Sequence, residues 1–160
     1  MYQYIFTKMS IFLLRHAESE FNAFIDRNKK DCDLSPNGRL QAKNIKPHHF
    51  DIVFCSPMKR TKQTLDLAEN ISYDKLYEWH MIREVKDSPC DFFEYESLIK
   101  ETKIEAYNRV DFVLDYLYNL IQTKGNIKIL LVGHSVIFRL LTNNEIQLRN
   151  AEIVEVNIRE

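Results

Sequence analysis

The sequence of 160 residues has only three cysteines, Cys32, Cys55 and Cys90, with no C-x-x-C pair and no zinc-type spacing. An odd, widely spaced set of this kind argues against the disulfide framework of small secreted domains. A reducing compartment fits it best, so the sequence predicts a cytoplasmic protein. The neighbours His48 and His49 cannot easily face one ion, and no third ligand is evident. We therefore expect neither a metal nor a cofactor.

The sequence also has almost no net charge and no long apolar run. Lysine and arginine number 22 against 23 aspartates and glutamates, which gives a net charge of −1 and no global field for nucleic acid or an anionic membrane. No apolar run approaches the ~20 residues that span a bilayer. The stretch 1–14 is interrupted by Gln3 and Lys8 and has no small-residue cleavage site after it, so we expect no signal peptide.

The length and composition favour one globular domain. Domains cluster near ~100–150 residues, and a chain with 45% hydrophobic and 28% charged residues can bury a sizeable core. The sequence contains no repeat, low-complexity tract or linker that would mark a boundary. We therefore expect a single domain over residues 1–160.

Short apolar runs that stop at polar residues predict strands. Residues 11–14 form a continuous apolar run, which is typical of a strand buried on both faces of a parallel sheet. Residues 51–55 and 127–132 have the same character, and 153–158 alternates as a final strand. The β-prone stretch 73–85 is rich in aromatic residues and ends before a proline-containing break.

Helix signals alternate with these strands. Ser56 and Pro57 are typical of an N-cap and a first helical position, and apolar residues recur at three-to-four spacing from Ile104 until Gly125 stops the pattern. Helices are expected at 39–45, 56–69, 104–122 and 135–141. The alternation predicts an α/β fold whose ligand site lies at the carboxyl ends of the strands.

Polar residues follow three predicted strands directly. Arg15 and His16 follow the first, Arg60 lies shortly after the second, and His134 follows the late one. Because the carboxyl ends of parallel strands meet on one rim, these side chains should converge. Arginine supplies planar, permanently charged donors for phosphate oxygens, and the backbone N–H groups of a helix start favour an anion. This group predicts a phosphoryl site with a histidine available as nucleophile.

Four segments in this order resemble the motifs of the histidine phosphatase superfamily, also called phosphoglycerate-mutase-like. The matched motifs are R-H-G-E-[TS]-x-x-N at 15–22, L-[ST]-x-x-G-x-x-Q-A at 34–42, S-x-x-x-R-[AT]-x-Q-T at 56–64 and V-[GS]-H-[GS] at 132–135. One departure is Ala17, where the family usually has glycine. The resemblance implies a three-layer α/β sandwich with a mostly parallel central sheet flanked by helices. We expect residues 84–103 to form a short cap segment.

The resemblance also implies roles for individual residues. His16 would attack phosphorus and become phosphohistidine. The phosphoryl oxygens would be held by Arg15, Asn22, Arg60, His134 and Ser135. The physical argument agrees, because His16 must be neutral to present a lone pair, and two nearby guanidinium groups disfavour its protonated form.

A carboxyl group is needed twice in such a reaction. The leaving alkoxide needs a proton, and the attack of water on phosphohistidine needs a base. Glu84 is our choice for both roles, since it directly follows residues 81–83 near the end of the β-prone stretch, as the family's acid follows its strand. Asp87 and Glu18 remain alternatives.

These features predict a metal-independent phosphatase that hydrolyses phosphomonoesters, a phosphoric monoester hydrolase of the histidine acid phosphatase type. Its substrate would be a phosphorylated small molecule or a phosphoprotein, with no nucleic acid or membrane partner. A phosphoglycerate mutase-type phosphotransferase is the alternative enzyme, although 84–103 leaves little chain for the insertions by which mutases enclose their substrate. A catalytically weak phosphate-binding or interaction protein is the alternative of another class.

Overall fold

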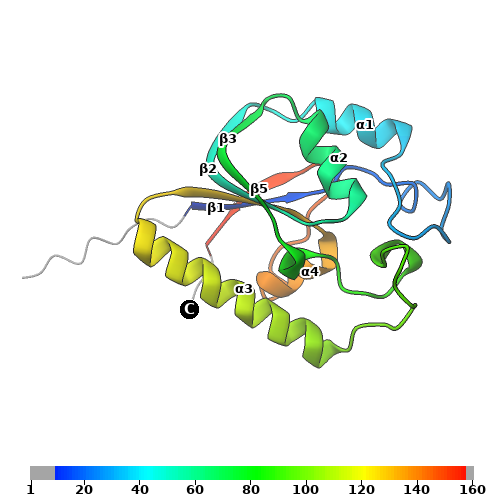
Figure 1. The fold of residues 1–160 in the computed structure, drawn as a ribbon. Helices are drawn as coiled ribbons and strands as arrows, with labels where there is room; N and C mark the ends of the chain where they lie inside the picture. The colour runs from blue at the N-terminus through cyan, green and yellow to red at the C-terminus, as the bar shows by residue number, and fades with distance from the viewer. Residues whose placement is uncertain (1–9, 158–160) are drawn as a thin grey trace, which may run out of the picture.

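A five-stranded sheet forms the centre of the computed structural model, which describes residues 10–157. The strands are β1 Ser10–Arg15, β2 His48–Cys55, β3 Ile71–Glu78, β4 Lys128–Gly133 and β5 Ile153–Val156. Their order across the sheet is β3-β2-β4-β1-β5, and only β5 runs antiparallel to its neighbour (Figure 1). The stretch 1–9, which bears on the signal peptide, and Ile158 of the predicted last strand lie outside the described residues.

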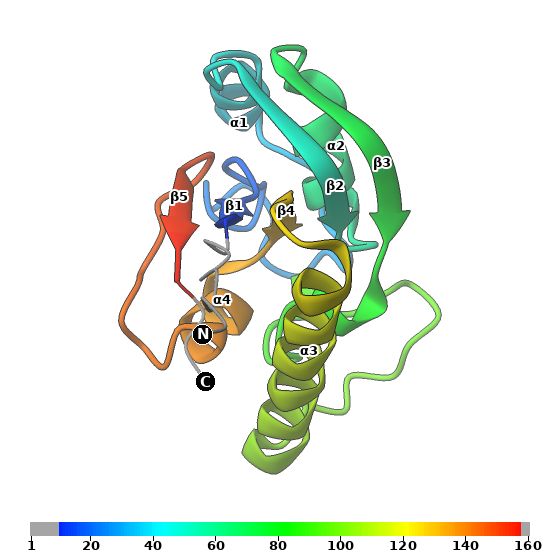
Figure 2. The same cartoon turned by 90° about the vertical axis from the view of Figure 1, so that its left-hand side faces the viewer.

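Helices cover both faces of this sheet. They are α1 Pro36–Lys43, α2 Lys59–Leu67, α3 Lys103–Lys124 and α4 Ser135–Leu141. Figure 2 shows α1 and α2 on one face and α3 and α4 on the other, which confirms the predicted three-layer sandwich. Among residues 10–157, no helix combines the length and apolar character needed to cross a membrane.

The core lies on both faces because the central strands alternate their side chains between them. In β1, Leu13 packs in the cluster beneath α3 and α4, whereas the next residue, Leu14, packs in the cluster beneath α2. Both are fully buried. A strand that is apolar at every position is the expected consequence of burial on two faces, as predicted for 11–14.

The helix predicted at 39–45 spans 36–43, and the strand predicted at 51–55 begins at His48. Two further predicted elements differ from the structure. The second helix begins at Lys59 instead of Ser56 and ends at Leu67. The N-cap position is Met58, and Ser56 lies two residues before it. The Ser56 hydroxyl is hydrogen-bonded to a ring nitrogen of His134 on the neighbouring strand end, at 2.7 Å, and its oxygen accepts the Met58 N–H at 3.5 Å. The stretch predicted at 73–85 is a strand only as far as Glu78, and a 3₁₀ turn, η1 His80–Ile82, follows.

Gly38 in α1 allows a close approach between α1 and the segment after β1. A Cβ atom at Gly38 would lie 1.9 Å from the carbonyl oxygen of Glu18. The same carbonyl accepts the Ser35 N–H at 2.9 Å, so it cannot move without loss of that bond. The position therefore requires glycine.

We expect Gly38→Ala to lower the free energy of unfolding by about 1–3 kcal/mol, the usual cost of overpacking. The helix propensity of alanine favours the substitution by only about 1 kcal/mol, which does not offset a backbone clash. Urea denaturation measures the change, with Asn37→Ala at an exposed position of the same helix as control. Equal stability of the two variants would contradict this account.

Candidate active site

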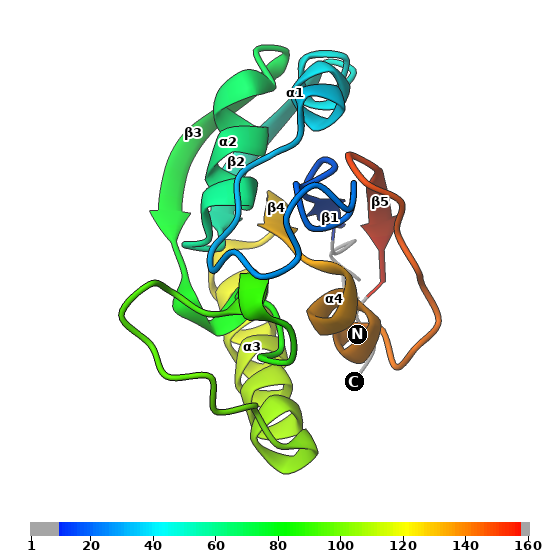
Figure 3. The ribbon, with the colours of Figure 1, turned by 90° about the vertical axis from the view of Figure 1, so that its right-hand side faces the viewer.

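A pocket of about 530 Å³ lies at the carboxyl end of the parallel strands. Figure 3 looks onto this end, where the loop after β1, the green segment after β3 and the start of α4 gather. The pocket is lined by six of the residues that the sequence pointed to: Arg15, His16, Asn22, Arg60, Glu84 and Ser135. His134 lies buried beside them, with its ring centroid 5.3 Å from that of His16. Of the predicted cap segment, residues 84–88, 90, 91, 101 and 103 line the pocket.

His16 is held in one orientation by its own backbone neighbourhood. Its backbone N–H donates to the Gly133 carbonyl at 3.0 Å, and its Nδ1 lies 2.7 Å from the Ala17 carbonyl oxygen. A carbonyl can only accept, so Nδ1 carries the hydrogen and Nε2 presents a lone pair. Burial lowers the pKa of His16 well below its usual value, and the charge of Arg60 lowers it further, so the ring is neutral.

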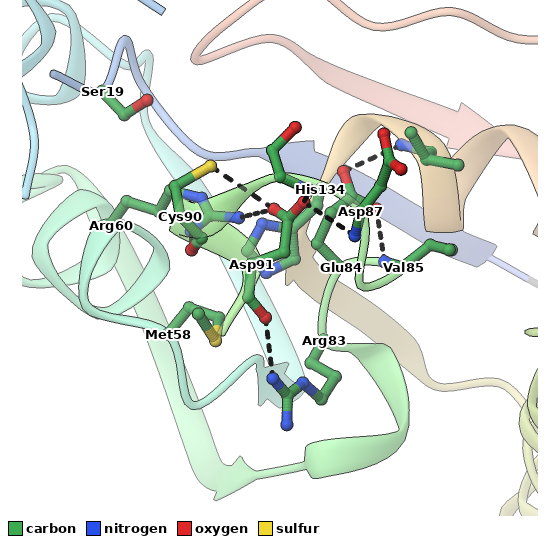
Figure 4. Close-up of polar contacts among 12 residues, drawn as sticks. Ser19, Met58, Arg60, Arg83, Glu84, Val85, Asp87, Cys90, Asp91 and His134 are labelled. Carbon is green, nitrogen blue, oxygen red and sulfur yellow. Dashed lines mark hydrogen bonds and ion pairs between the residues drawn. The ribbon is translucent and has the colours of Figure 1, made fainter. Parts of the chain in front are cut away.

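Arg60 is fully buried at the base of the pocket. Its Nη1 donates to the Cys90 carbonyl at 2.6 Å, and its Nε donates to His16 Nε2 at 3.3 Å. Its Nη2 donates to Asp91 Oδ1 at 3.0 Å (Figure 4). A guanidinium that donates to Nε2 confirms that this nitrogen carries no hydrogen. The Arg60 Nε–H group therefore lies beside the unprotonated ring nitrogen of His16.

His134 is oriented by Ser56. A neutral imidazole has one donor and one acceptor nitrogen, and the Ser56 hydroxyl lies 2.7 Å from Nε2. When that hydroxyl donates, Nδ1 carries the hydrogen. Nδ1 is buried and has no hydrogen-bond partner among the described residues, which fits a donor reserved for a ligand oxygen. Burial and the charge of Arg60 lower the pKa of His134 well below its usual value.

Arg15 and Asn22 contribute further donors to the pocket wall. Arg15 Nη1 donates to the Leu148 carbonyl at 2.9 Å, whereas its buried Nε has no partner among residues 10–157. Asn22 Oδ1 accepts the hydroxyl of Ser19 at 2.9 Å and the side-chain amide of Asn150 at 3.3 Å. The Asn22 amide nitrogen is therefore the atom left to donate to a ligand.

Glu84 is buried beside the start of α4. Its carboxyl oxygens accept the backbone N–H groups of Val85, Val136 and Ile137 at 2.9–3.0 Å. Burial raises the pKa of Glu84 above its usual value, and the neighbouring charge of Asp91 raises it further. A carboxyl group with a raised pKa is suited to give up and take back a proton near neutral pH.

The two alternative carboxylates are placed differently. Glu18 accepts the Ser35 hydroxyl at 2.6 Å and is not among the residues that line the pocket. Asp87 lines the pocket, but its side chain is 69% exposed and pairs with Lys100 at 2.7 Å. Asp87 is thus held toward solvent by its lysine partner, whereas Glu84 is buried in the pocket wall, so the geometry favours Glu84.

Sequence reasoning missed three residues of the site. Asp91 pairs with Arg60, Ser56 orients His134, and Asn150 donates to the His16 carbonyl at 3.0 Å. A signal existed for Asp91, because Ser88 and Asp91 have the S-x-x-D spacing of a capping box and form one in the structure. Nothing in the local sequence marks Asn150.

The departure at Ala17 is accommodated without strain. Its methyl group is fully buried in a small cluster with Leu34 and Ala42. Its N–H donates to the Thr64 hydroxyl at 3.0 Å. The methyl group therefore adds to the packing behind His16.

Over the described part of the chain, no group of three or more His, Cys, Asp or Glu side chains is arranged to hold a metal ion. The absence of a metal requirement stays a prediction. What the geometry does provide is a neutral histidine, two arginines, a second histidine and a buried carboxyl group around one pocket. On a mostly parallel sheet, this set defines an α/β protein with a site for a small anionic group.

The family can now be stated. The family model described as the histidine phosphatase superfamily (branch 1) matches residues 11–159, and the chain belongs to this superfamily. Phosphoserine phosphatase 1 of Hydrogenobacter thermophilus is 31% identical over 160 residues, a match that covers 83% of this chain and 74% of that protein.

Two further proteins show the range of the likeness. The 6-phosphofructo-2-kinase/fructose-2,6-bisphosphatase 4 of Homo sapiens is 36% identical over 98 residues, which cover 58% of this chain and 20% of that protein's length. The crystal structure of phosphoglycerate mutase from Bacillus anthracis matches with a TM-score of 0.69 at 15% identity, over 92% of this chain and 86% of that chain. The fold is thus phosphoglycerate-mutase-like, and the family and its relatives support phosphatase activity.

Proposed function

We propose that this chain is a phosphoric monoester hydrolase of the histidine acid phosphatase type, which works through a phosphohistidine on His16 and without a metal ion. One observation carries the proposal. The Nδ1 atom of His16 is engaged by the Ala17 carbonyl at 2.7 Å, so that the lone pair of Nε2 faces Arg60 in the pocket. A buried neutral nucleophile beside a fixed cation is the arrangement that attack on a phosphoryl group requires.

In the first half of the reaction, His16 Nε2 attacks phosphorus and the bond from phosphorus to the ester oxygen breaks. The leaving oxygen takes a proton from Glu84, and burial, which raises the pKa of this carboxyl, favours the protonated form that this step needs. The products are phosphohistidine, the free alcohol and the Glu84 carboxylate.

The phosphoryl oxygens need donors while charge moves onto them. We assign this role to the side chains of Arg15, Asn22, Arg60, His134 and Ser135. The buried Nε of Arg15 and Nδ1 of His134 have no partner among the described residues, so each can donate to an oxygen without breaking another bond. Donors fixed in advance in a buried site stabilise developing charge at little reorganisation cost.

In the second half, water attacks phosphorus and the bond to Nε2 breaks. The Glu84 carboxylate takes a proton from this water, so that free phosphate leaves and the starting enzyme is restored. One carboxyl group thus serves as acid and then as base.

We propose a phosphorylated small molecule or the phosphorylated side chain of a protein as substrate. A pocket of about 530 Å³ holds a phosphoryl group with a small organic part. Phosphoserine phosphatase 1 and the fructose-2,6-bisphosphatase, the relatives described above, act on phosphomonoesters according to their names, which supports this class of substrate.

A phosphate-release screen over a panel of phosphomonoesters tests the proposal. We expect release to persist in the presence of a chelator and to be inhibited by vanadate, which resembles a phosphoryl group in transfer. Loss of activity in chelator, with recovery on addition of a divalent ion, would overturn the metal-free mechanism. Transfer of phosphate to an added acceptor without release would favour the mutase alternative, and vanadate binding without any turnover would favour a binding protein.

A further inference from the structure

The carboxylate of Asp91 is buried in the wall of the pocket, on the 3₁₀ turn η2 Pro89–Asp91. Its Oδ1 accepts Arg60 Nη2 at 3.0 Å and the Cys90 thiol at 3.5 Å. Its Oδ2 accepts the backbone N–H of Ser88 at 2.9 Å and, at 3.4 Å, that of Asp87. Both oxygens are therefore fixed by the turn itself.

The same turn holds Arg60 at a second point. The Cys90 carbonyl accepts Arg60 Nη1 at 2.6 Å, so that adjacent residues of η2 bind the two Nη groups. A guanidinium is planar, and two bonds at its Nη end leave only one direction for Nε–H. That direction is toward His16 Nε2, at 3.3 Å. Figure 4 shows Arg60, Cys90 and Asp91 in this arrangement.

We propose that Asp91 is a positioning residue, which rests on the function proposed above: it orients the Arg60 guanidinium toward the place of the phosphoryl group and places a negative charge in the buried wall that also holds Glu84. The first effect acts through the ion pair. The second acts through the negative charge of Asp91, which lies in the same buried wall as Glu84. Asp91 thereby fixes the orientation of Arg60 and adds a negative charge to the surroundings of Glu84.

The surroundings of Glu84 support the second effect. The groups that face it are Arg15 from β1, Arg60 from α2, Asp91 from η2 and the backbone N–H groups of Val136 and Ile137 from α4. These two cations and the N–H groups of Val136, Ile137 and Val85 favour the carboxylate form. Burial is the largest influence that raises the pKa of Glu84, and Asp91 is the next. Without Asp91, the balance shifts toward the carboxylate.

Asp91→Asn separates charge from shape. The asparagine keeps the side-chain shape and an oxygen to accept Arg60 Nη2 but removes the negative charge. Its amide nitrogen cannot accept the Ser88 N–H, so the fold of the variant is checked by circular dichroism. The pKa of Glu84 should then fall, so that Glu84 loses its proton at lower pH. We expect the alkaline limb of the kcat/KM profile for an alkyl phosphate to move to lower pH than in the wild type. With p-nitrophenyl phosphate, whose leaving group needs little protonation, the limb should stay in place.

Asp91→Ala removes both the charge and the acceptor. Arg60 is then buried without its partner, and we expect the Kd for vanadate, measured by calorimetry, to rise roughly tenfold or more, as for loss of a charged hydrogen bond. Glu94→Gln is the matched control, since it removes one carboxylate charge from an exposed position of the same segment. It should leave both the pH profile and the vanadate Kd at wild-type values.

The proposal is overturned if Asp91→Asn keeps the wild-type pH profile with alkyl phosphates. It is overturned equally if folded Asp91→Ala binds vanadate as tightly as the wild type. Asp91→Asn keeps the shape of the side chain, so its profile decides the matter if Asp91→Ala fails to fold. Should the wild type hydrolyse no phosphomonoester at all, the proposed function fails, whereas the vanadate comparison of Asp91→Asn, Asp91→Ala and the wild type still tests the positioning of Arg60.

Discussion

His16→Ala is expected to reduce phosphate release by roughly 10³-fold or more, the scale of loss when an enzyme's nucleophile is removed. In the proposed reaction, the bond from Nε2 to phosphorus exists only in the wild type. Steady-state turnover of p-nitrophenyl phosphate measures the effect, because its product, p-nitrophenolate, is coloured. The arginines and His134 remain, so vanadate should still bind to the variant.

His49→Ala is the matched control for this substitution. His49 is exposed on β2, and its Nδ1 lies 2.8 Å from the Ser72 hydroxyl on the neighbouring strand, away from the pocket. This variant should retain wild-type turnover. Normal turnover by His16→Ala would show that both the nucleophile and the covalent route are wrong.

The largest substrate-dependent effect is expected for Glu84→Gln. A glutamine cannot donate an acidic proton, and general acid catalysis contributes roughly 10²–10⁴-fold. A sugar alkoxide needs that proton, whereas p-nitrophenolate leaves with little help. Phosphorylation of the enzyme by an alkyl phosphate should therefore fall far more than phosphorylation by p-nitrophenyl phosphate.

The measurement must resolve the first turnover. Loss of the base also slows attack by water on phosphohistidine, and this later step affects both substrates equally. Rapid-quench experiments with the two substrates give the ratio of phosphorylation rates before that step matters. If Glu84→Gln kept the wild-type ratio and Asp87→Asn changed it, the acid role would move to Asp87.

The strands and most helices follow from the sequence because their signals are local. The run 11–14 is apolar at each position, which is the pattern of a strand buried on both faces of a parallel sheet. The long helix α3 has both its capping box at Thr102 and its stop at Gly125, where φ is +77°. Such elements carry their own boundaries.

The start of the second helix is predicted wrongly because its local signal includes a residue whose partner is distant in the sequence. Ser56 and Pro57 have the residue types of a helix start, yet Ser56 is bonded to His134, 78 positions away in the chain. No window of local sequence contains that partner. The bond to His134 fixes the Ser56 side chain at the strand end, and its oxygen accepts only the Met58 N–H, at 3.5 Å, ahead of the first helical residue, Lys59.

The candidate site was predictable to the same extent. His16, Arg60 and His134 follow strand ends, and the rim of a parallel sheet brings strand ends together. Asn150 reaches the site from the loop before β5, and only the antiparallel pairing of β5 with β1 places that loop beside His16. Residues that depend on such pairing have no signal in a single sequence.

The phosphoenzyme itself tests the central claim most directly. The wild type is mixed with a ³²P-labelled phosphomonoester, quenched in alkali within the first turnovers, digested and sequenced by mass spectrometry. We predict phosphate on the peptide that contains His16, in a linkage stable to alkali and lost in acid, and no label in His16→Ala. An active enzyme with no label on His16, or with an acid-stable label on another residue, would contradict the account.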